Sequence, residues 1–224
     1  MEKRLRRLPE RVPRSVTSES TAIVGLIDYG AGNIQSIGNA VAHIGAQVLI
    51  VKRADELTRV THLILPGVGA FGYCAQRLRN SGLLTAVGDI ALIERRPVLG
   101  ICVGMQLLAD SSDELGVQEG LGWVGGKVAK LRCEIEDVRI PHVGWNAALF
   151  EAQFGDFAPG SSHHFYFDHS YAYGTPARGT VVASCVHGQK FTAALRFGNI
   201  VGVQFHPEKS QESGIRFLRG FLEM

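Results

Sequence analysis

Cys102 is the residue whose surroundings in the sequence most clearly favour chemistry. It stands between Gly100 and Gly104 in the stretch LGICVGMQLL (99–108), where a short apolar run gives way to a segment of helical character. This G-x-nucleophile-x-G spacing is typical of a strand-to-helix turn whose glycines let the backbone pass close to an exposed nucleophile. A helix N-terminus favours the thiolate through its dipole and free N–H groups. The pattern predicts a nucleophilic Cys102; the alternative is a small buried cysteine at a Gly-rich strand end.

The stretch GVQFHPEKS (202–210) contains the partners that a cysteine nucleophile needs. His206 and Glu208 stand two residues apart after an apolar run, and in an extended chain that spacing directs both side chains to the same side. An imidazole can take the thiol proton and pass it to a leaving group, while a carboxylate fixes the imidazole tautomer. We therefore expect Cys102, His206 and Glu208 to form a triad. Alone, the His-Pro-Glu stretch would better fit a surface turn with an incidental ion pair.

An acyl-transfer site also needs N–H groups directed at the developing oxyanion. The backbone N–H of Val103 directly follows the nucleophile and is one candidate. The Gly-rich stretch PGVGAFG (66–72) follows another apolar run and offers a second donor at Val68 or Gly69. Because glycines also mark ordinary tight turns, the second assignment depends on where the fold places that turn.

Composition and charge exclude several classes of protein. The 224 residues are 46% hydrophobic and 20% charged, as in an ordinary globular protein. The formal net charge of +2 is concentrated in residues 1–20, so the remainder is close to neutral and does not favour nucleic-acid binding. No apolar run is long enough to cross a membrane. The four cysteines are far apart without C-x-x-C pairing, which predicts neither disulfides nor zinc and indicates a reducing, cytoplasmic compartment. No metal or organic cofactor is indicated.

The alternation of apolar runs and helical segments predicts an α/β domain over residues 21–224. Residues 1–20 are rich in arginine but contain no apolar signal region, and we interpret them as a disordered extension or a mis-assigned start. The first half predicts a doubly wound, mostly parallel sheet with its ligands at the carboxyl ends of the strands. The strands expected there are 22–27, 47–51, 62–65 and 97–101, and the helices include 33–44 and 103–109.

After Gly120, closely spaced strand-like runs separated by turn residues predict added antiparallel strands in the C-terminal half. These runs are 123–131, 139–143, 165–173, 181–187, 191–197 and 200–205, and a helix over 211–222 closes the chain. The histidines at 142, 163, 164, 169 and 187 show no metal-ligand spacing, so we expect structural or surface roles for them.

Taken together, the motifs resemble those of the class I (triad) glutamine amidotransferases, whose fold is flavodoxin-like, and within them the glutaminase subunits of imidazole glycerol phosphate synthase. The resemblance covers residues 21–224. The elbow alone would fit many hydrolases, whereas the ordered combination is specific. It consists of DYGAGN (28–33), LPGVGAFG (65–72), LGICVGMQLL (99–108), EGLGW (119–123), PHVGWN (141–146), HSY (169–171) and GVQFHPEKS (202–210).

The resemblance implies a specific reaction. Cys102 would attack the side-chain amide carbon of L-glutamine, ammonia would leave, and hydrolysis of the thioester would give L-glutamate. Glutamine binding is implied for the backbone around Gly69 and for Gln106, Ser170 and Tyr171. For Gln106, the alternative is a solvated helix residue.

The resemblance also implies a protein partner. In the related enzymes the ammonia passes to a (β/α)8-barrel cyclase subunit of histidine biosynthesis, in a heterodimer whose assembly switches the glutaminase on. Candidates for the coupling are Asn33, the Gly67–Val68 peptide and Lys209, and candidates for the docking face are Trp145, Tyr166 and Phe167.

Two departures and three alternatives remain. The leader at residues 1–20 has no counterpart in the compact family form, and we expect no catalytic role for it. Asp168 stands where this family usually has an apolar residue, so a carboxylate either perturbs the pocket or faces solvent. Closely similar glutaminases feed sugar-aminating enzymes of surface-polysaccharide synthesis. A stand-alone cysteine hydrolase or thioesterase would show high basal turnover without a partner. A non-catalytic subunit is disfavoured by the intact Cys102, His206 and Glu208.

Overall fold

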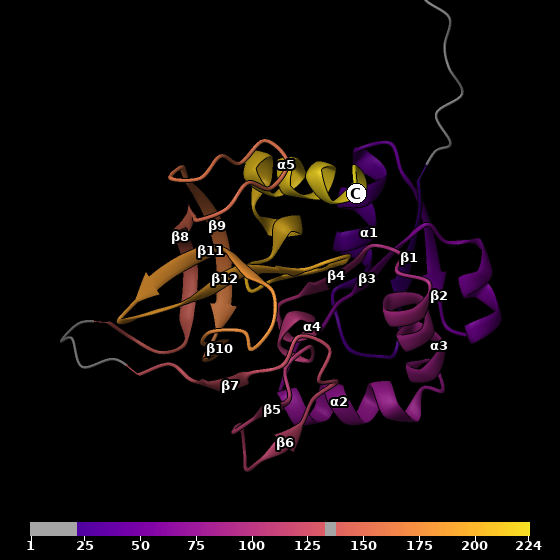
Figure 1. The fold of residues 1–224 in the computed structure, drawn as a ribbon, viewed down its shortest axis with the longest axis horizontal. Helices are drawn as coiled ribbons and strands as arrows, with labels where there is room; N and C mark the ends of the chain where they lie inside the picture. Colours follow the sequence, from indigo (N-terminus) through magenta and orange to yellow (C-terminus); the bar gives the residue numbers. More distant parts are fainter. Residues whose placement is uncertain (1–21, 133–137) are drawn as a thin grey trace, which may run out of the picture.

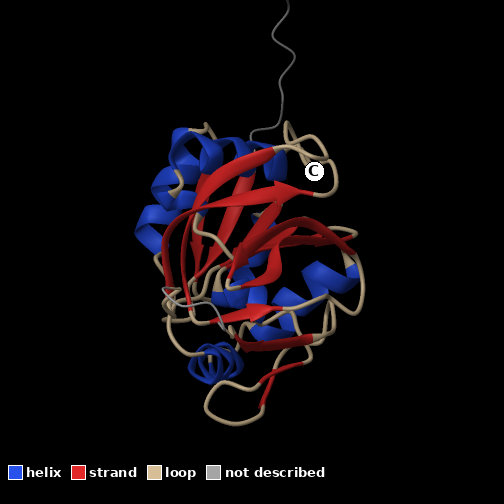
Figure 2. Ribbon diagram, turned by 90° about the vertical axis from the view of Figure 1, so that its left-hand side faces the viewer, coloured by secondary structure: helices blue, strands red, loops and turns tan. Residues whose placement is uncertain are grey.

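The computed structural model describes residues 22–132 and 138–224, which are arranged around one large mixed sheet (Figure 1). In these residues, the sheet has nine strands in the order β2-β1-β3-β4-β13-β12-β11-β8-β9. Helices cover both of its faces (Figure 2). The expected extension over residues 1–20 lies outside the described residues.

The first five strands in that order run parallel to one another. Three of them, β3, β4 and β13, are buried at every residue, as their largely apolar sequences predict for strands covered on both faces. The five strands are β2 (Gln47–Val51), β1 (Ile23–Ile27), β3 (His62–Leu65), β4 (Val98–Ile101) and β13 (Ile200–Val203).

The remaining four strands pair antiparallel and extend the sheet beyond β13. They are β12 (Gln189–Phe197), β11 (Thr180–His187), β8 (His142–Phe150) and β9 (Ser162–His169). A second, smaller sheet lies beside them and consists of β10 (Tyr171–Tyr173), β7 (Lys127–Lys130), β5 (Ser111–Ser112) and β6 (Gln118–Glu119). The α/β class and the division into parallel and antiparallel halves are thereby confirmed.

The helices lie on opposite faces of the parallel half, with α1 and α5 on one side and α2 and α4 on the other (Figure 1). The α-helices are α1 (Ile34–His43), α2 (Phe71–Asn80), α3 (Leu84–Gly88), α4 (Val103–Gln106) and α5 (Gln211–Leu222). Shorter turns are 3-10 helices η1 (Ala54–Arg59) and η3 (Pro207–Lys209) and the π-helical turn η2 (Asp89–Ile93). No helix in the described ranges is long and apolar enough to cross a membrane.

An aromatic cluster joins β9, the end of β13 and α5. The rings of Phe165 and Phe205 stack with centroids 3.9 Å apart, and Phe217 meets Phe205 edge to face at 5.3 Å. All three side chains are completely buried. Buried aromatic pairs add stabilisation beyond their area, so this cluster fixes the chain directly before His206.

Several predicted boundaries differ from the structure. The strand expected over 123–131 is limited to β7 (Lys127–Lys130), because Gly125 and Gly126 before it have positive φ values of 75° and 94°. The helix expected over 103–109 ends at Gln106, because the carbonyls of Leu107 and Ala109 accept hydrogen bonds from Leu121 and Gly122 instead of continuing the helix. The strand expected over 139–143 is β8, which begins after Pro141 and continues to Phe150; proline lacks the N–H that a paired strand needs. The run 165–173 is interrupted at Ser170, where the chain passes from the large sheet to the small one.

Candidate active site

Cys102 occupies a sharp turn between β4 and α4. Its backbone has φ 55° and ψ −114°, a conformation that is costly for a residue with a side chain. The turn is held because the Cys102 N–H donates to Val203 O at 2.8 Å and its carbonyl accepts from Gln106 N at 3.1 Å. A Cβ atom on Gly104 would lie 1.9 Å from Leu65 O. The glycine therefore lets α4 approach β3, as the elbow spacing predicts.

His206 and Glu208 follow β13 and are adjacent in space to the Cys102 turn. Because a carboxylate only accepts, His206 Nδ1 donates to Glu208 Oε1, at 2.9 Å. The Glu208 side chain is completely buried, and its Oε2 has no hydrogen-bond partner among the described residues. His206 and Glu208 lie next to each other as predicted, but the geometric reason for that prediction is wrong. The chain turns into η3 at Pro207, so Glu208 reaches the imidazole from a 3-10 turn and not from one side of a strand.

The backbone around His206 is anchored to the antiparallel half of the sheet. The His206 N–H donates to Tyr166 O at 2.9 Å, which continues the contact of this segment with β9. The Ser210 hydroxyl donates to His206 O at 2.6 Å and accepts from Tyr166 N at 2.9 Å. These bonds fix the backbone at both ends of η3, and the position of the His206 imidazole follows from that.

The electrostatic environment of His206 favours its protonated form. Burial lowers the pKa of this imidazole, but hydrogen bonds and charge from Cys102 and Glu208 outweigh burial and raise the pKa to about 10. At neutral pH, an imidazolium therefore lies between the sulfur and the carboxylate. A positive charge beside a cysteine is the environment in which the sulfur becomes a nucleophile.

The Gly-rich loop 66–69 lies directly against α4. A Cβ atom on Gly67 would be 2.6 Å from Gly104 N, so this close approach requires glycine. Two buried side chains anchor the loop. The Tyr29 hydroxyl donates to Pro66 O at 2.6 Å, and the Cys74 thiol donates to Val68 O at 3.5 Å.

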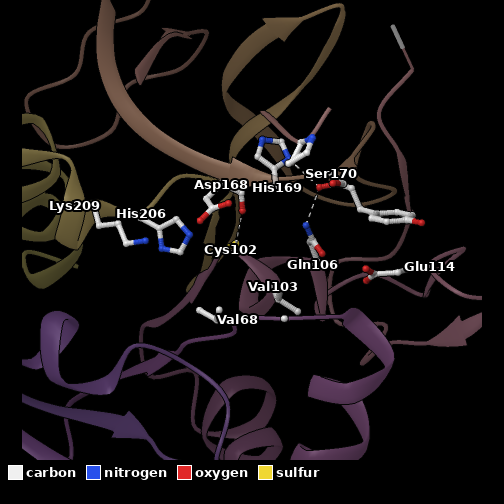
Figure 3. Close-up of a pocket in the computed structure, with 13 residues that line it drawn as sticks. Val68, Cys102, Val103, Gln106, Glu114, Asp168, His169, Ser170, His206 and Lys209 are labelled. Carbon is white, nitrogen blue, oxygen red and sulfur yellow. Dashed lines mark hydrogen bonds between the residues drawn. The ribbon is translucent and has the colours of Figure 1, made fainter. Parts of the chain in front are cut away.

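A pocket of about 340 Å³ opens above Cys102 (Figure 3). His206 and Lys209 lie at one end and Glu114 at the other, with Gln106 between them (Figure 3). Most of the predicted site residues line it, while Glu208 lies behind His206, and Asn33 precedes α1 and is not among the lining residues. The predicted residues on its wall are Val68, Gly69, Cys102, Val103, Gln106, Ser170, Tyr171, His206 and Lys209.

Gln106 is a buried residue and not a solvated one, with 2% of its surface exposed. Its Nε2 donates to Tyr171 O at 2.9 Å and to Gln204 Oε1 at 3.0 Å. Gln204 in turn donates through its own Nε2 to Cys102 Sγ at 3.7 Å. Sequence analysis missed Gln204, although a polar residue inside the apolar run VGVQF was a signal that could have indicated it.

Glu114 is the second residue that sequence analysis missed. It lines the pocket, and its Oε2 accepts the N–H of Phe71 at the start of α2 at 2.6 Å. It lies in the polar stretch SSDELG, which carries no motif that would separate it from a surface loop. Only the fold brings this carboxylate to the pocket.

Asp168 also lines the pocket, although its side chain is largely exposed to solvent. The oxygen of its backbone carbonyl lies 4.0 Å from Cys102 Sγ. This carboxylate therefore lies at the pocket wall and also faces solvent.

The residues expected at a docking face divide into two groups. Trp145 is 47% exposed and meets Tyr166 edge to face with centroids 6.3 Å apart, and the Lys209 Nζ lies 5.2 Å from the centre of the Tyr166 ring. Phe167, in contrast, is completely buried. The expectation for Phe167 is wrong because alternation along β9 turns it into the core.

The chain is similar to proteins of one known family. The family model described as glutamine amidotransferase class-I matches residues 25–224. The imidazole glycerol phosphate synthase subunit HisH of Zymomonas mobilis is 42% identical over 210 residues, which cover 92% of this chain and 98% of that protein. The chloroplastic imidazole glycerol phosphate synthase hisHF of Arabidopsis thaliana is 40% identical over 218 residues, or 94% of this chain and 36% of that protein. A crystal structure of a glutamine amidotransferase superposes with a TM-score of 0.70 at 21% identity, covering 89% of this chain and 97% of that one.

Replacing Glu208 by glutamine removes the negative charge that supports the His206 imidazolium. Because Glu208 helps to raise the pKa of His206 to about 10, the pKa in Glu208→Gln should fall toward the ordinary value of about 6.5. His206 would then lose its proton at a lower pH than in the unmodified protein. An NMR titration of the His206 ring measures this, with Glu212→Gln at the start of α5 as the control; an unchanged pKa in Glu208→Gln would contradict the electrostatic account.

Proposed function

The chain belongs to the glutamine amidotransferase class-I family, and from this we infer that it hydrolyses L-glutamine to L-glutamate and ammonia as the glutaminase subunit of an imidazole glycerol phosphate synthase. The observation that carries the proposal is the buried Glu208–His206 pair next to Cys102, whose turn opens into a pocket of about 340 Å³. A pocket of this size suits a small polar molecule.

We assign the chemical steps to Cys102, His206 and Glu208. The Cys102 thiolate attacks the carboxamide carbon of glutamine, and the electron pair of the C=O bond moves onto oxygen. The N–H groups of Val103 and of Val68 or Gly69 receive this oxyanion. When the C–N bond breaks, His206 transfers its proton to the nitrogen and ammonia departs. A thioester between Cys102 and the former amide carbon remains. His206, now neutral, takes a proton from the water that attacks the thioester, and glutamate and the Cys102 sulfur separate.

The pocket wall supplies complementary groups for the rest of glutamine. Both Nε2 hydrogens of Gln106 are used, on Tyr171 O and Gln204 Oε1, which leaves its Oε1 as an acceptor for a substrate N–H. Gly69, Ser170 and Tyr171 complete the predicted binding surface. Glu114 lies at the end opposite His206 (Figure 3), where its carboxylate suits the α-ammonium group of the substrate.

We further propose a cyclase subunit with a (β/α)8 barrel as the partner. The Arabidopsis relative combines a region similar to this chain with further sequence, since this chain covers only 36% of it. On β8, Val143, Trp145 and Leu149 lie on the solvent-facing side, next to the pocket wall formed by Asp168 of β9. A partner seated there would cover this apolar strand face and receive ammonia at the pocket.

Within this proposal, Lys209 and Asn33 are the residues that sense the partner. Lys209 lies at the pocket beside Tyr166, and Asn33 precedes α1 in the loop after β1. The cytoplasm is the proposed compartment, because Cys74, Cys102 and Cys185 are all free thiols and catalysis needs the second of them reduced.

The proposal is tested by glutamate release from glutamine, with and without the cyclase subunit and its ribonucleotide ligand. We expect low basal turnover that rises by orders of magnitude in the complex and is lost in Cys102→Ala. Cys185→Ala, which removes a buried thiol on β11, should retain activity. High turnover without a partner would favour a stand-alone hydrolase, no activation by the cyclase would favour a sugar-aminating partner, and turnover by Cys102→Ala would refute the mechanism.

Glu114→Gln should weaken glutamine binding selectively. The amide keeps an oxygen that can accept the Phe71 N–H, whereas the charge that faces the substrate ammonium is lost. A hydrogen bond to a charged group contributes roughly 1.5–3 kcal/mol, so KM should rise roughly 10- to 100-fold while kcat changes little. Steady-state kinetics measures both constants, with Glu119→Gln on β6 as the control. A normal KM would remove Glu114 from the binding site.

A further inference from the structure

A second polar network begins at the pocket wall and leaves it through β9 and β8. His169 lines the pocket, and its Nδ1 lies 2.9 Å from Tyr171 O. Its other nitrogen, Nε2, lies 3.1 Å from Nδ1 of His142, the residue directly opposite on β8. His142 Nε2 is 3.1 Å from Asn146 Nδ2, which also donates to Val186 O on β11 at 3.0 Å. The network therefore links four strands, β10, β9, β8 and β11.

Its hydrogen-bond pattern admits a single arrangement of protons. A carbonyl only accepts, so His169 Nδ1 carries a hydrogen for Tyr171 O and its Nε2 is the acceptor. His142 must then donate through Nδ1 and accept through Nε2. Asn146 supplies that last hydrogen, and its amide orientation is fixed because its Oδ1 accepts the Ala147 N–H at 2.7 Å. Both imidazoles are neutral in this arrangement, and each has one defined tautomer.

The surroundings keep both imidazoles neutral. His142 and His169 are 3% and 6% exposed, and His142 stacks on Phe167 while His169 packs against Phe191. Burial, followed by the charge of neighbouring imidazoles, lowers the pKa of His142 to about 3. Burial likewise lowers the pKa of His169, to about 4, although its bond to Tyr171 O opposes the shift.

The titratable groups that face the pair are other histidines and the nucleophile. His187 of β11 stacks on His142 with ring centroids 4.0 Å apart and donates its Nε2 hydrogen to Arg139 O. On the pocket side, His206 acts on His169 through its charge, and Cys102 shares the pocket wall with His169.

The network ends at the backbone carbonyl of Tyr171, which also holds Gln106 in the pocket wall. Tyr171 O accepts from His169 Nδ1 and also from Gln106 Nε2, each at 2.9 Å. If His169 adopted the other tautomer, a nitrogen lone pair would face this carbonyl and repel it. The Tyr171 segment and the Gln106 amide would then lose their common anchor.

We propose that His142 and Asn146 are positioning residues for glutamine binding, which hold His169 in the Nδ1–H tautomer that anchors the Tyr171 carbonyl beside Gln106. The inference rests on the proposed function for its substrate, and on the contacts of the described residues for its geometry. Neither His142 nor Asn146 touches the pocket, so their effect passes through His169.

The variant Asn146→Asp tests the direction of the network. A carboxylate only accepts, so His142 Nε2 must carry a hydrogen in this variant. The introduced carboxylate raises the pKa of His142 above its unmodified value of about 3. While His142 is an imidazolium, it also keeps its Nδ1 hydrogen and the bond to His169 remains. When His142 loses a proton as the pH rises, Nδ1 becomes an acceptor, His169 must reverse its tautomer, and the bond to Tyr171 O is lost.

We therefore expect KM for glutamine to rise at least fivefold between pH 6 and pH 9 in Asn146→Asp, with kcat changed less than twofold. The unmodified protein should show no such KM rise, because both imidazoles stay neutral throughout that range. Asn146→Ala lacks the carboxylate, so any loss there should be the same at every pH. Asn39→Asp on α1 is the control for added charge.

A KM in Asn146→Asp that is unchanged at every pH, or that falls as the pH rises, would overturn the proposal. Nitrogen-15 NMR of the unmodified protein provides an independent test, which does not depend on whether Asn146→Asp folds. It should show both His142 and His169 neutral with hydrogen on Nδ1, and a hydrogen on His169 Nε2 would overturn the network. This spectrum does not depend on turnover, so a protein inactive on glutamine would refute the proposed function while leaving the tautomers as a separate result.

Discussion

A completely buried carboxylate, that of Glu208, faces His206 Nδ1 at 2.9 Å, and the rest of the site is arranged around this contact. A buried negative charge is costly unless a positive group compensates it. The imidazolium of His206 provides that compensation and in turn presents its charge to Cys102. Cys102, His206 and Glu208 thus form one electrostatically coupled unit, which needs a backbone that holds the three side chains in place.

The sheet order provides that backbone. β4 and β13 are parallel neighbours, so the residues that follow them leave the sheet at the same edge, although Cys102 and His206 are far apart in sequence. The Cys102 N–H still bonds to Val203 O beyond the last paired residues. The stacked rings of Phe165 and Phe205 fix the approach to His206 from β9. The spacing between Cys102 and His206 is therefore set by strand pairing and aromatic packing more than by contacts among the three side chains.

Much of this arrangement could be predicted from local sequence. The glycines that flank Cys102 indicate a tight turn. The structure shows why glycine is needed at Gly104, since a Cβ atom there would lie 1.9 Å from Leu65 O. Long apolar runs likewise predict the buried parallel strands. The network of Asn146, His142 and His169 could not be predicted, because it depends on the register of β8 and β9. Glu114 was also inaccessible to prediction, since only the path of the chain after α4 brings its loop to the pocket.

The central claim is that Cys102 is the single nucleophile, activated by its setting and not by its residue type. The most direct measurement is labelling with a glutamine analogue that has an electrophilic carbon in place of the side-chain amide, followed by mass spectrometry of the digested protein. Among the four cysteines, the account predicts one adduct, on the peptide containing Cys102, and protection of that cysteine by excess glutamine. An adduct spread over several cysteines, or one that glutamine does not prevent, would contradict it.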